Sequence, residues 1–376
     1  MSKESHNKKS NYFDYNLLIL IVFLLCFGLV MLFSSSSYIA ANKYGDSAYF
    51  LKMQMRNIGV GLLLMIPLIF IDYRVWKRFA ILAYIGSFLL CCVVLVIGQS
   101  SHGSSRWLRI GPIQFQPSEV AKLGIIIAFA VLIEKVPNQL AEFKTLLKMV
   151  GILVPIVIVV AANNLSTAII IMGIGICMLF VASPKYSHFF VIIGSAAVAM
   201  IGAFGLLFSY RRTRIEAWLK PETAGEDGYQ TLMGLYAIGS GGLFGKGLGK
   251  SLQKLGNVPE SQNDMIFTII CEELGLFGAT CVILLFILLL WRMMIIANNA
   301  PDLFGSLLVT GVMAHIAIQV ILNIAVVTNT IPNTGVILPF ISYGGTSLIF
   351  LMAEMGIVLS VSRRIKLESF DKQEKA

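Results

Sequence analysis

The stretch "NLLILIVFLLCFGLVMLF" (residues 16–33) runs for 18 residues without a charged side chain. A helix needs about 20 mostly apolar residues to cross the hydrocarbon core of a bilayer. Comparable runs recur along the 376 residues of the chain, which is 57% hydrophobic and only 13% charged. Soluble proteins are less apolar and more charged. The sequence therefore predicts an all-α integral membrane protein. No small-x-small cleavage site follows the first run, so we expect a retained span rather than a removed signal peptide.

Ten transmembrane helices are predicted from the apolar runs. They divide the chain into a cytoplasmic tail (residues 1–14), a ten-helix membrane domain (15–364) and a second cytoplasmic tail (365–376). The predicted spans lie near residues 15–36, 56–71, 79–98, 118–134, 148–163, 165–182, 188–209, 265–291, 303–328 and 340–361.

The distribution of Lys and Arg predicts the orientation of these spans. With the N-terminus inside, 16 of the 29 Lys and Arg lie on the cytoplasmic side, and seven of the other 13 lie in one long loop. Long loops contribute little to the positive-inside rule, so the relevant comparison is 16 against 6. Both termini are therefore predicted to be cytoplasmic. The net charge of +9 is first explained by this orientation signal, and no nucleic-acid partner is predicted.

The long outer loop, residues 210–264, joins the predicted seventh and eighth helices. Connections of this length are usually functional. Its segment "GLFGKGLGKS" (242–251) resembles a phosphate-binding P-loop, but that motif requires Gly at position 244, which is Phe. A nucleotide site is therefore excluded. Lys246 and Lys250 remain as cations of a glycine-rich outer loop without an assigned role.

Asp264 stands where this loop enters the eighth span. One interpretation is a helix N-cap, since Asp accepts hydrogen bonds from the first free amides of a helix. The other is a general base, whose pKa the neighbouring apolar residues 265–267 would raise by desolvation. Position alone favours the cap.

Glu272 and Glu273 follow two turns further along the same span, at a depth where an unpaired charge is costly. They either pair with cations of the outer loop or line a wet cavity, and pairing is the favoured interpretation.

The segment "GSSRWLRIGPIQFQPSEVAKL" (103–123) carries a second group of polar side chains. Pro117 suits the first position of a helix. Glu119 and Lys122 are three residues apart, so they share a helix face and can form an ion pair. Arg106 and Arg109 flank Trp107, a residue that favours the headgroup level. The segment is either an interfacial loop before a capped helix or the wall of an outward-facing pocket for an anionic headgroup. Residue types alone do not separate the two.

The uncharged segment "IPNTGVILPFISYGGTS" (331–347) opens the tenth span. Its small residues, Gly345 and Ser347 among them, favour close helix packing. The alternative is that free amides at the helix start receive a phosphate.

Polar residues also occur inside the last two spans. His315, Gln319 and Asn323 are expected to bond neighbouring helices, and Glu354 to reach the interface or pair with Arg363 or Arg364. The six cysteines lie in apolar runs without metal-ligand spacing, which favours packing over metal binding.

Four stretches together resemble one family, the SEDS proteins (shape, elongation, division and sporulation), which include RodA, FtsW and SpoVE. The resemblance runs from about residue 15 to 364 and is closer to the FtsW and SpoVE branch. The stretches are "GSSRWLRIGPIQFQPSEVAK" (103–122), "GYQTLMGLYAIGSGGLFGKGLGKS" (228–251), "VPESQNDMIFTIICEELGLFG" (258–278) and "NTGVILPFISYGGTS" (333–347).

This resemblance implies a peptidoglycan glycosyltransferase that polymerises lipid II into glycan strands at the outer membrane face. Asp264 matches the catalytic acid of the family. The resemblance also implies a class B penicillin-binding transpeptidase as partner, beside lipid II, the nascent glycan strand and membrane lipids. It leaves a divalent cation, Mg²⁺ or Mn²⁺, open as a cofactor. The expected substrate-binding residues are Arg106, Glu119, Lys122, Lys246, Lys250, Ser342, Tyr343, Gly345 and Ser347.

One departure from the family concerns the junction of the fifth and sixth spans. The family usually has "PDLGT" there, whereas this chain has "NNLST", with Asn164 in place of the Asp. Any metal or proton role of that carboxylate is therefore closed to this chain. Two rival functions remain, a lipid II flippase and a non-catalytic scaffold for a transpeptidase. A flippase would place its polar groups near mid-membrane, whereas here they gather at one face.

Overall fold

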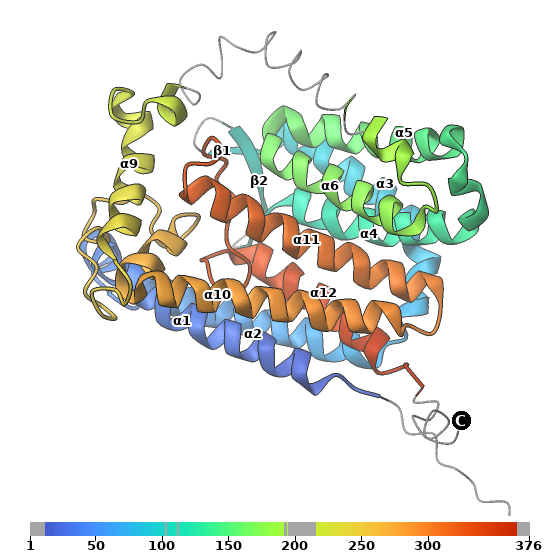
Figure 1. Ribbon diagram of the computed structural model, residues 1–376, viewed down its shortest axis with the longest axis horizontal. Helices are drawn as coiled ribbons and strands as arrows, with labels where there is room; N and C mark the ends of the chain where they lie inside the picture. The colour runs from blue at the N-terminus through green and yellow to red at the C-terminus, as the bar shows by residue number, and fades with distance from the viewer. Residues whose placement is uncertain (1–11, 102–103, 111–112, 192–193, 195–215, 367–376) are drawn as a thin grey trace, which may run out of the picture.

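The structure is a computed structural model that describes residues 12–101, 104–110, 113–191, 194 and 216–366. Its long helices run roughly parallel to the longest axis of the molecule (Figure 1). The predicted seventh span, near 188–209, lies almost entirely outside the described residues. The helices are α1 (Tyr15–Tyr44), α2 (Tyr49–Phe70), α3 (Trp76–Ile97), α4 (Pro117–Lys135), α5 (Phe143–Asn163), α6 (Leu165–Ala182), α9 (Gly225–Ser240), α10 (Ile266–Asn298), α11 (Leu303–Val327) and α12 (Gly345–Ser362).

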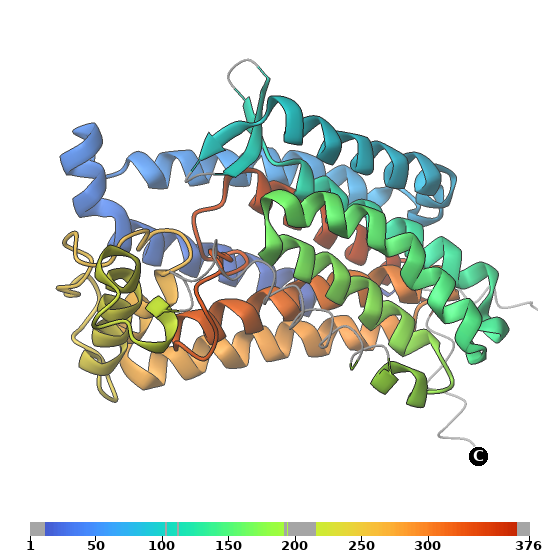
Figure 2. The ribbon, with the colours of Figure 1, turned by 90° about the horizontal axis from the view of Figure 1, so that it is seen from above.

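The helices form two groups with α11 between them. On one side α3 packs along α4, and α5 along α6; on the other α12 packs along α2, and α1 contacts both α2 and α10. Helix α11 touches α10, α6 and α4, and Figure 2 shows it between the two groups. Eight of the described helices are long and apolar enough to cross a membrane. Helix α4 occupies the predicted fourth position but carries four charged residues, so it is not one of the eight. The all-α membrane fold is confirmed.

The two ends of the chain lie side by side. The amide of Tyr12 donates to the carbonyl of Ile365 at 3.1 Å, and the amide of Asp14 donates to Ser362 Oγ at 2.9 Å. Arg292, near the end of α10, pairs with Asp14 at 2.6 Å. The described residues nearest to the two termini therefore lie together at one end of the helices, and their cytoplasmic location stays a prediction.

Several predicted boundaries are wrong. Helix α2 begins at Tyr49 rather than near 56, α5 begins at Phe143 rather than near 148, and α10 ends at Asn298 rather than near 291. Two further differences have local reasons. Helix α1 continues to Tyr44, where Gly45 ends it with a left-handed φ of 70°. The tenth span begins at Gly345 rather than near 340, because Phe340 has a φ of 63° and cannot continue a helix.

Short strands, which the sequence did not predict, connect α3 to α4. Strand β2 (Ser104–Ile110) pairs antiparallel with β1 (Gln99–Ser101) and with β3 (Ile113–Phe115). The three strands thus form a small antiparallel sheet before Pro117 begins α4.

Helix α10 is broken at Gly275, whose φ of 68° and ψ of −168° are not helical. Residues 241–249 of the outer loop, which we call the glycine loop, form backbone hydrogen bonds with α10 on both sides of the break. The amides of Lys246 and Gly247 donate to the carbonyls of Glu272 and Glu273, both at 2.9 Å. Across the break, the amides of residues 276 and 277 donate to the carbonyls of residues 242 and 243, at 2.9 and 3.0 Å. The backbone groups freed by the break are therefore bonded by the loop, as a low-dielectric setting requires.

This contact explains two glycines of the glycine loop. A Cβ on Gly245 would lie 2.2 Å from the carbonyl oxygen of Glu273, and one on Gly241 would lie 2.0 Å from that of Cys271. Gly245 and Gly275 also have positive φ angles, 77° and 68°. The glycines allow a loop backbone to lie directly against a helix backbone.

We predict that Gly245→Ala lowers thermal stability much more than Gly249→Ala, measured as the melting temperature in nanodiscs. Both glycines have left-handed φ angles, 77° and 80°, so both substitutions incur about 1–2 kcal/mol of backbone strain. A Cβ on Gly245 would lie 2.2 Å from the carbonyl oxygen of Glu273, whereas a Cβ on Gly249 would have no atom within 4 Å. Equal losses for the two variants would contradict the proposed role of the contact.

Candidate functional site

Asp264 lies directly before α10, where α9, α11 and the segment 331–344 meet. Its backbone carbonyl accepts a hydrogen bond of 2.7 Å from Asn323 Nδ2 of α11, and the same amide group donates to the carbonyl of Val336 at 2.7 Å. A Cβ placed on Gly335 would lie 3.9 Å from Asp264 Oδ2. Asn323 thus holds the acid and the segment beside it in one position. The sequence predicted Asn323 only as a residue that bonds neighbouring helices.

The carboxyl group of Asp264 is nearly enclosed, with 7% of the residue exposed. Burial, reinforced by the nearby charge of Glu260, raises the pKa of Asp264 to about 7. Hydrogen bonds from its own amide, from the Met265 amide and from Gln230 of α9 oppose this rise in pKa. Oδ1 has no hydrogen-bond partner among the described residues. A carboxyl group that titrates near neutral pH with one oxygen free is suited to accept a proton from a bound hydroxyl.

The expected helix-cap role of Asp264 is not observed in the usual form. The N-cap residue of α10 is Met265, and no side chain caps the helix. The side chain of Asp264 is therefore not committed to the free amides in the first turn of α10.

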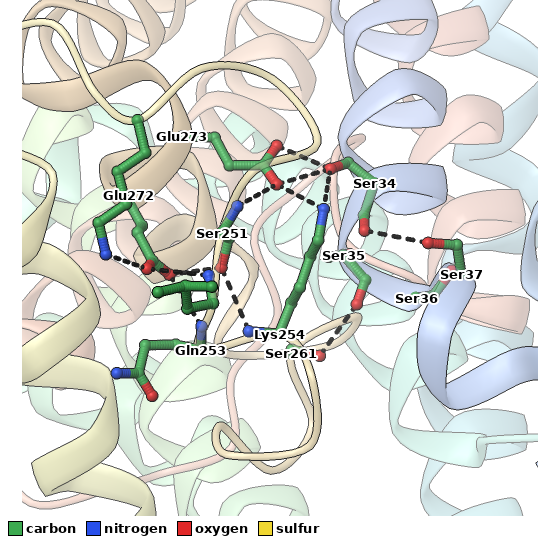
Figure 3. A network of polar contacts seen from close by, with 12 residues as sticks. Ser34, Ser35, Ser36, Ser37, Ser251, Gln253, Lys254, Ser261, Glu272 and Glu273 are labelled. Carbon is green, nitrogen blue, oxygen red and sulfur yellow. Dashed lines mark hydrogen bonds and ion pairs between the residues drawn. The ribbon is translucent and has the colours of Figure 1, made fainter. Parts of the chain in front are cut away.

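Glu272 and Glu273 are fully buried and paired, as predicted (Figure 3). Glu273 accepts from Lys254 Nζ at 2.8 Å and from Ser34 Oγ of α1 at 2.7 Å. Glu272 accepts from Lys246 Nζ at 2.7 Å and from the hydroxyl of Ser251. Both carboxylates also accept backbone amides of residues 251–253, at 3.1–3.3 Å. The network fastens the loop after residue 245 to α10 and α1. Nothing in the sequence distinguishes Ser34 from the other members of a run of four serines.

The two lysines of the glycine-rich segment differ. Lys246 neutralises Glu272, and its side chain remains partly exposed. Lys250 is exposed, and its side chain makes no hydrogen bond or ion pair within the described part of the chain. Lys250 is therefore the freer cation of the two, and substrate binding by either lysine stays a prediction.

Glu119 and Lys122 form the predicted ion pair at the start of α4, with 2.9 Å between Oε2 and Nζ. Both side chains are buried. Pro117 occupies the first turn of this helix, as expected. Arg106 belongs to β2, but its side chain lies outside the described residues, so the structure does not place its guanidinium.

The segment before α12 packs on α2. The hydroxyl of Ser342 accepts from the Leu338 amide at 2.8 Å, and its carbonyl accepts from Gln54 at 3.1 Å. The ring of Tyr343 meets Phe50 edge to face, and its amide donates to the carbonyl of Gln262 at 2.9 Å. Ser342 and Tyr343 therefore have structural partners, and the second links α12 to the residues just before Asp264.

Gly345 and Ser347 lie in the first turn of α12, where Gly344 is the N-cap and no side chain caps the helix. A Cβ on Gly345 would lie 3.9 Å from Asn57 Nδ2 of α2. This spacing agrees with the packing role, and phosphate binding by these amides stays a prediction.

Asn164, which stands where the family usually has Asp, caps α6. Its side-chain oxygen accepts from the Thr167 amide at 3.2 Å. Ser166, in the same turn, donates to the carbonyl of Thr334 at 2.8 Å, next to the Gly335 that faces Asp264. An amide oxygen fulfils the capping role as well as a carboxylate.

The expectation for Glu354 is wrong. It is fully buried and pairs with His315 Nδ1 of α11 at 2.8 Å, whereas Arg364 reaches Asp72 at 3.1 Å. Glu354 lies in the middle of α12, too far from the helix end to reach the interface. His315 therefore does bond a neighbouring helix, as predicted.

Metal binding has little support from these side chains. No three His, Cys, Asp or Glu groups converge within the described ranges. The carboxylate that acts on Asp264 is Glu260, which is bonded to Asn263. A divalent cation would therefore need most of its ligands from a bound substrate.

Comparison with known proteins connects this site to one family. The FtsW/RodA/SpoVE family model, described as "Cell cycle protein", matches residues 15–367. Stage V sporulation protein E of Bacillus subtilis (strain 168) is 40% identical over 357 residues, covering 93% of this chain and 97% of that protein. A protein of Geobacter sp. (strain M18) named probable peptidoglycan glycosyltransferase FtsW is 36% identical over 363 residues, covering 94% and 98%.

Solved structures agree with the sequence matches. One is a chain from work on the coordination of polymerization and crosslinking by a peptidoglycan synthase complex. It superposes with a TM-score of 0.79 at 28% identity, covering 95% of this chain and 99% of that one. The rod shape determining protein RodA of Thermus thermophilus superposes with a TM-score of 0.70 at 29% identity, covering 94% and 97%.

We predict that Glu273→Ala and Lys254→Ala each destabilise the protein by about 3–5 kcal/mol, because either change leaves a buried charge unpaired. The double variant should lose less than the sum of the two single losses. As a control, Lys52→Ala removes an exposed partner of Asp46 at 2.7 Å and should leave the melting temperature nearly unchanged. Strictly additive losses at 254 and 273 would contradict the pairing.

Proposed function

The chain belongs to the FtsW/RodA/SpoVE family, and from that premise we propose that it polymerises lipid II into glycan strands at the outer face of the cytoplasmic membrane. Asp264 is the catalytic base of this peptidoglycan glycosyltransferase. The observation that carries the proposal is a buried carboxyl group with a pKa of about 7, directly before α10 in a multi-pass membrane protein. A general base works best when its pKa lies near the working pH.

The proposed step is a displacement at the anomeric carbon of the donor. Asp264 takes the proton of the 4-hydroxyl of the acceptor GlcNAc while that oxygen bonds to the donor C1. The bond between C1 and the pyrophosphate breaks, and polyprenyl pyrophosphate leaves with the electron pair. Oδ1 is the oxygen assigned to the proton, since it has no hydrogen-bond partner among the described residues.

Cations of the outer face support the departure of the pyrophosphate. Lys250 is exposed, and Lys246 retains exposed surface beside its bond to Glu272. Arg106 and the Glu119–Lys122 pair are further members of the proposed substrate site. Positive charge near the developing pyrophosphate lowers the barrier electrostatically. A divalent cation carried by the pyrophosphate would require only one or two protein carboxylates, and no step here is routed through it.

One of the similar solved structures also supports a partner that crosslinks glycan strands. A solved relative belongs to a synthase complex described as coordinating polymerization and crosslinking. We propose that this chain works with a single-span transpeptidase of the class B penicillin-binding type.

The flippase alternative predicts a helix break near the middle of the bilayer. The break in α10 at Gly275 lies 17 residues from Arg292, which pairs with the residue before α1. At 1.5 Å per residue this is about 25 Å, near the outer boundary rather than the midplane. The geometry thus favours chemistry at the outer surface.

We predict that Asp264→Asn abolishes polymerisation of lipid II by the purified protein assembled with its transpeptidase. General-base assistance is worth about 10²–10⁴-fold in rate. Glycan strands are measured by gel electrophoresis, and Asp264→Asn should unfold no earlier than wild type at pH 8. The pKa of Asp264 is raised by folding, so its favourable contribution to stability is lost as the pH rises through about 7.

The matched control is Glu260→Gln, a neutralised carboxylate in the same loop, which should retain polymerisation at pH 8. Equal product from wild type and a folded Asp264→Asn variant would refute the base assignment. If neither wild type nor Asp264→Asn makes product, with the transpeptidase and Mg²⁺ or Mn²⁺ present, the result would favour the flippase or the scaffold function.

We also predict that the polymerisation rate rises with pH through a midpoint near 7, because only the ionised carboxylate accepts the proton. The charge of Glu260 helps to raise the pKa of Asp264. Glu260→Gln should therefore move the midpoint to lower pH. A midpoint that stays fixed, or moves upward, would show that another group controls the profile.

A further inference from the structure

Two contacts between α1 and α10 are separated by about the thickness of the hydrocarbon core of a membrane. Asp14 and Arg292 pair at the inner ends of α1 and α10, at 2.6 Å, and Ser34 and Glu273 bond at the outer side, at 2.7 Å. The contacts are separated by 20 residues on α1 and by 19 on α10. At 1.5 Å per residue, both intervals are about 28–30 Å, which is the thickness of a typical hydrocarbon core. The Ser34–Glu273 contact therefore marks the outer boundary.

The glycine loop lies on the membrane side of that boundary. Its residues 242 and 243 accept the amides of Leu276 and Phe277, which are 15–16 residues, or about 23–24 Å, from Arg292. Leu276 and Phe277 are 61% and 66% exposed, as lipid-facing side chains of a span are. Leu243 and Phe244 of the loop are 66% and 80% exposed beside them.

A groove lies on the other side of the loop, and the residues of α1 that line it show its depth in the membrane. It has a volume of about 480 Å³ and is lined mainly by apolar residues of α1, α2 and the loop. The loop contributes Leu248 and Gly249, and α1 contributes Val30 and Phe33. Val30 and Phe33 precede Ser34 by four residues and one, so they lie below the outer boundary. Ser34, Ser37 and Lys254, which also line the groove, lie at this boundary or beyond it.

We infer that the glycine loop is a membrane-inserted wedge, with Leu243, Phe244 and Leu248 among the acyl chains of the outer leaflet. Irregular backbone is tolerated at this depth only where its polar groups are bonded. Here the broken α10 provides those bonds, through the carbonyls of residues 272 and 273 and the amides of 276 and 277. A loop predicted from its length and charge to be wholly extracytoplasmic is thus anchored in lipid.

The charges around the wedge agree with this placement. Lys246 and Lys250 flank its tip at the level where phosphate headgroups lie, and cations there are attracted to anionic lipids. The groove between α1, α2 and Leu248 accepts an acyl chain of the surrounding leaflet. The wedge joins the bilayer to the segment of α10 that follows Asp264.

The test is quenching of an added tryptophan by brominated acyl chains. Phe244→Trp, Leu248→Trp, Phe277→Trp and Leu255→Trp are each prepared in the full chain, in nanodiscs of phosphatidylglycerol and phosphatidylethanolamine with or without bromine on the acyl chains. The emission of the parent protein, with its four tryptophans, is subtracted. Phe277→Trp is the lipid-facing control. Leu255→Trp is the exposed control outside the membrane, since the neighbouring Gly256 faces Tyr38, four residues beyond Ser34.

We expect quenching of the added tryptophan at 244 and at 248 to match that at 277 and to exceed that at 255 at least about twofold, because quenching requires ring and acyl chain to meet at one depth. Two test positions keep the result decisive if one variant fails to fold. Quenching at 244 and 248 no greater than at 255 would overturn the inference and place the apolar loop above the membrane, open to another protein. Neither outcome depends on glycosyltransferase activity.

Discussion

The backbone contact between the glycine loop and the break in α10 is the constraint on which the outer half of this protein depends. Four hydrogen bonds replace those that α10 loses at Gly275. Because they join residues 242–247 to residues 272–277, they fix a long connection against a transmembrane helix at membrane depth. The buried carboxylates of Glu272 and Glu273 then add side-chain bonds to residues 246–254 and to Ser34. The P-loop resemblance is a consequence of this close backbone approach and has no connection with nucleotides.

Because Asp264 directly precedes the first turns of α10, the contact that fixes this helix also fixes the position of Asp264. With its helix held by the loop on one side and its carbonyl held by Asn323 on the other, the acid stays in a nearly closed site. Burial then sets its acid–base behaviour and brings the pKa to about 7. A fixed position and a pKa near neutral pH are the two properties that a general base requires.

The sequence predicted what depends on local spacing or on long apolar runs. The i,i+3 pair of Glu119 and Lys122, Pro117 at the start of α4 and nine of the ten helix positions are examples. It did not predict contacts between residues far apart in the chain, such as the bonds of Asn323 to Asp264 and Val336, or the pairing of Glu354 with His315. The hydropathy pattern also predicted that the whole segment 210–264 lies outside the membrane. Its glycines and lysines lower the mean hydropathy, so the few apolar residues of the loop do not form an apolar run.

The most direct test of the account is the titration of Asp264 itself, by infrared difference spectroscopy of wild type minus Asp264→Asn in nanodiscs between pH 5 and 9. The account predicts a protonated carboxyl band at low pH that disappears with a midpoint near 7, since burial raises the pKa of Asp264 to about that value. A carboxylate already ionised at pH 5 would contradict the buried base, and with it the link between the fixed α10 and the chemistry.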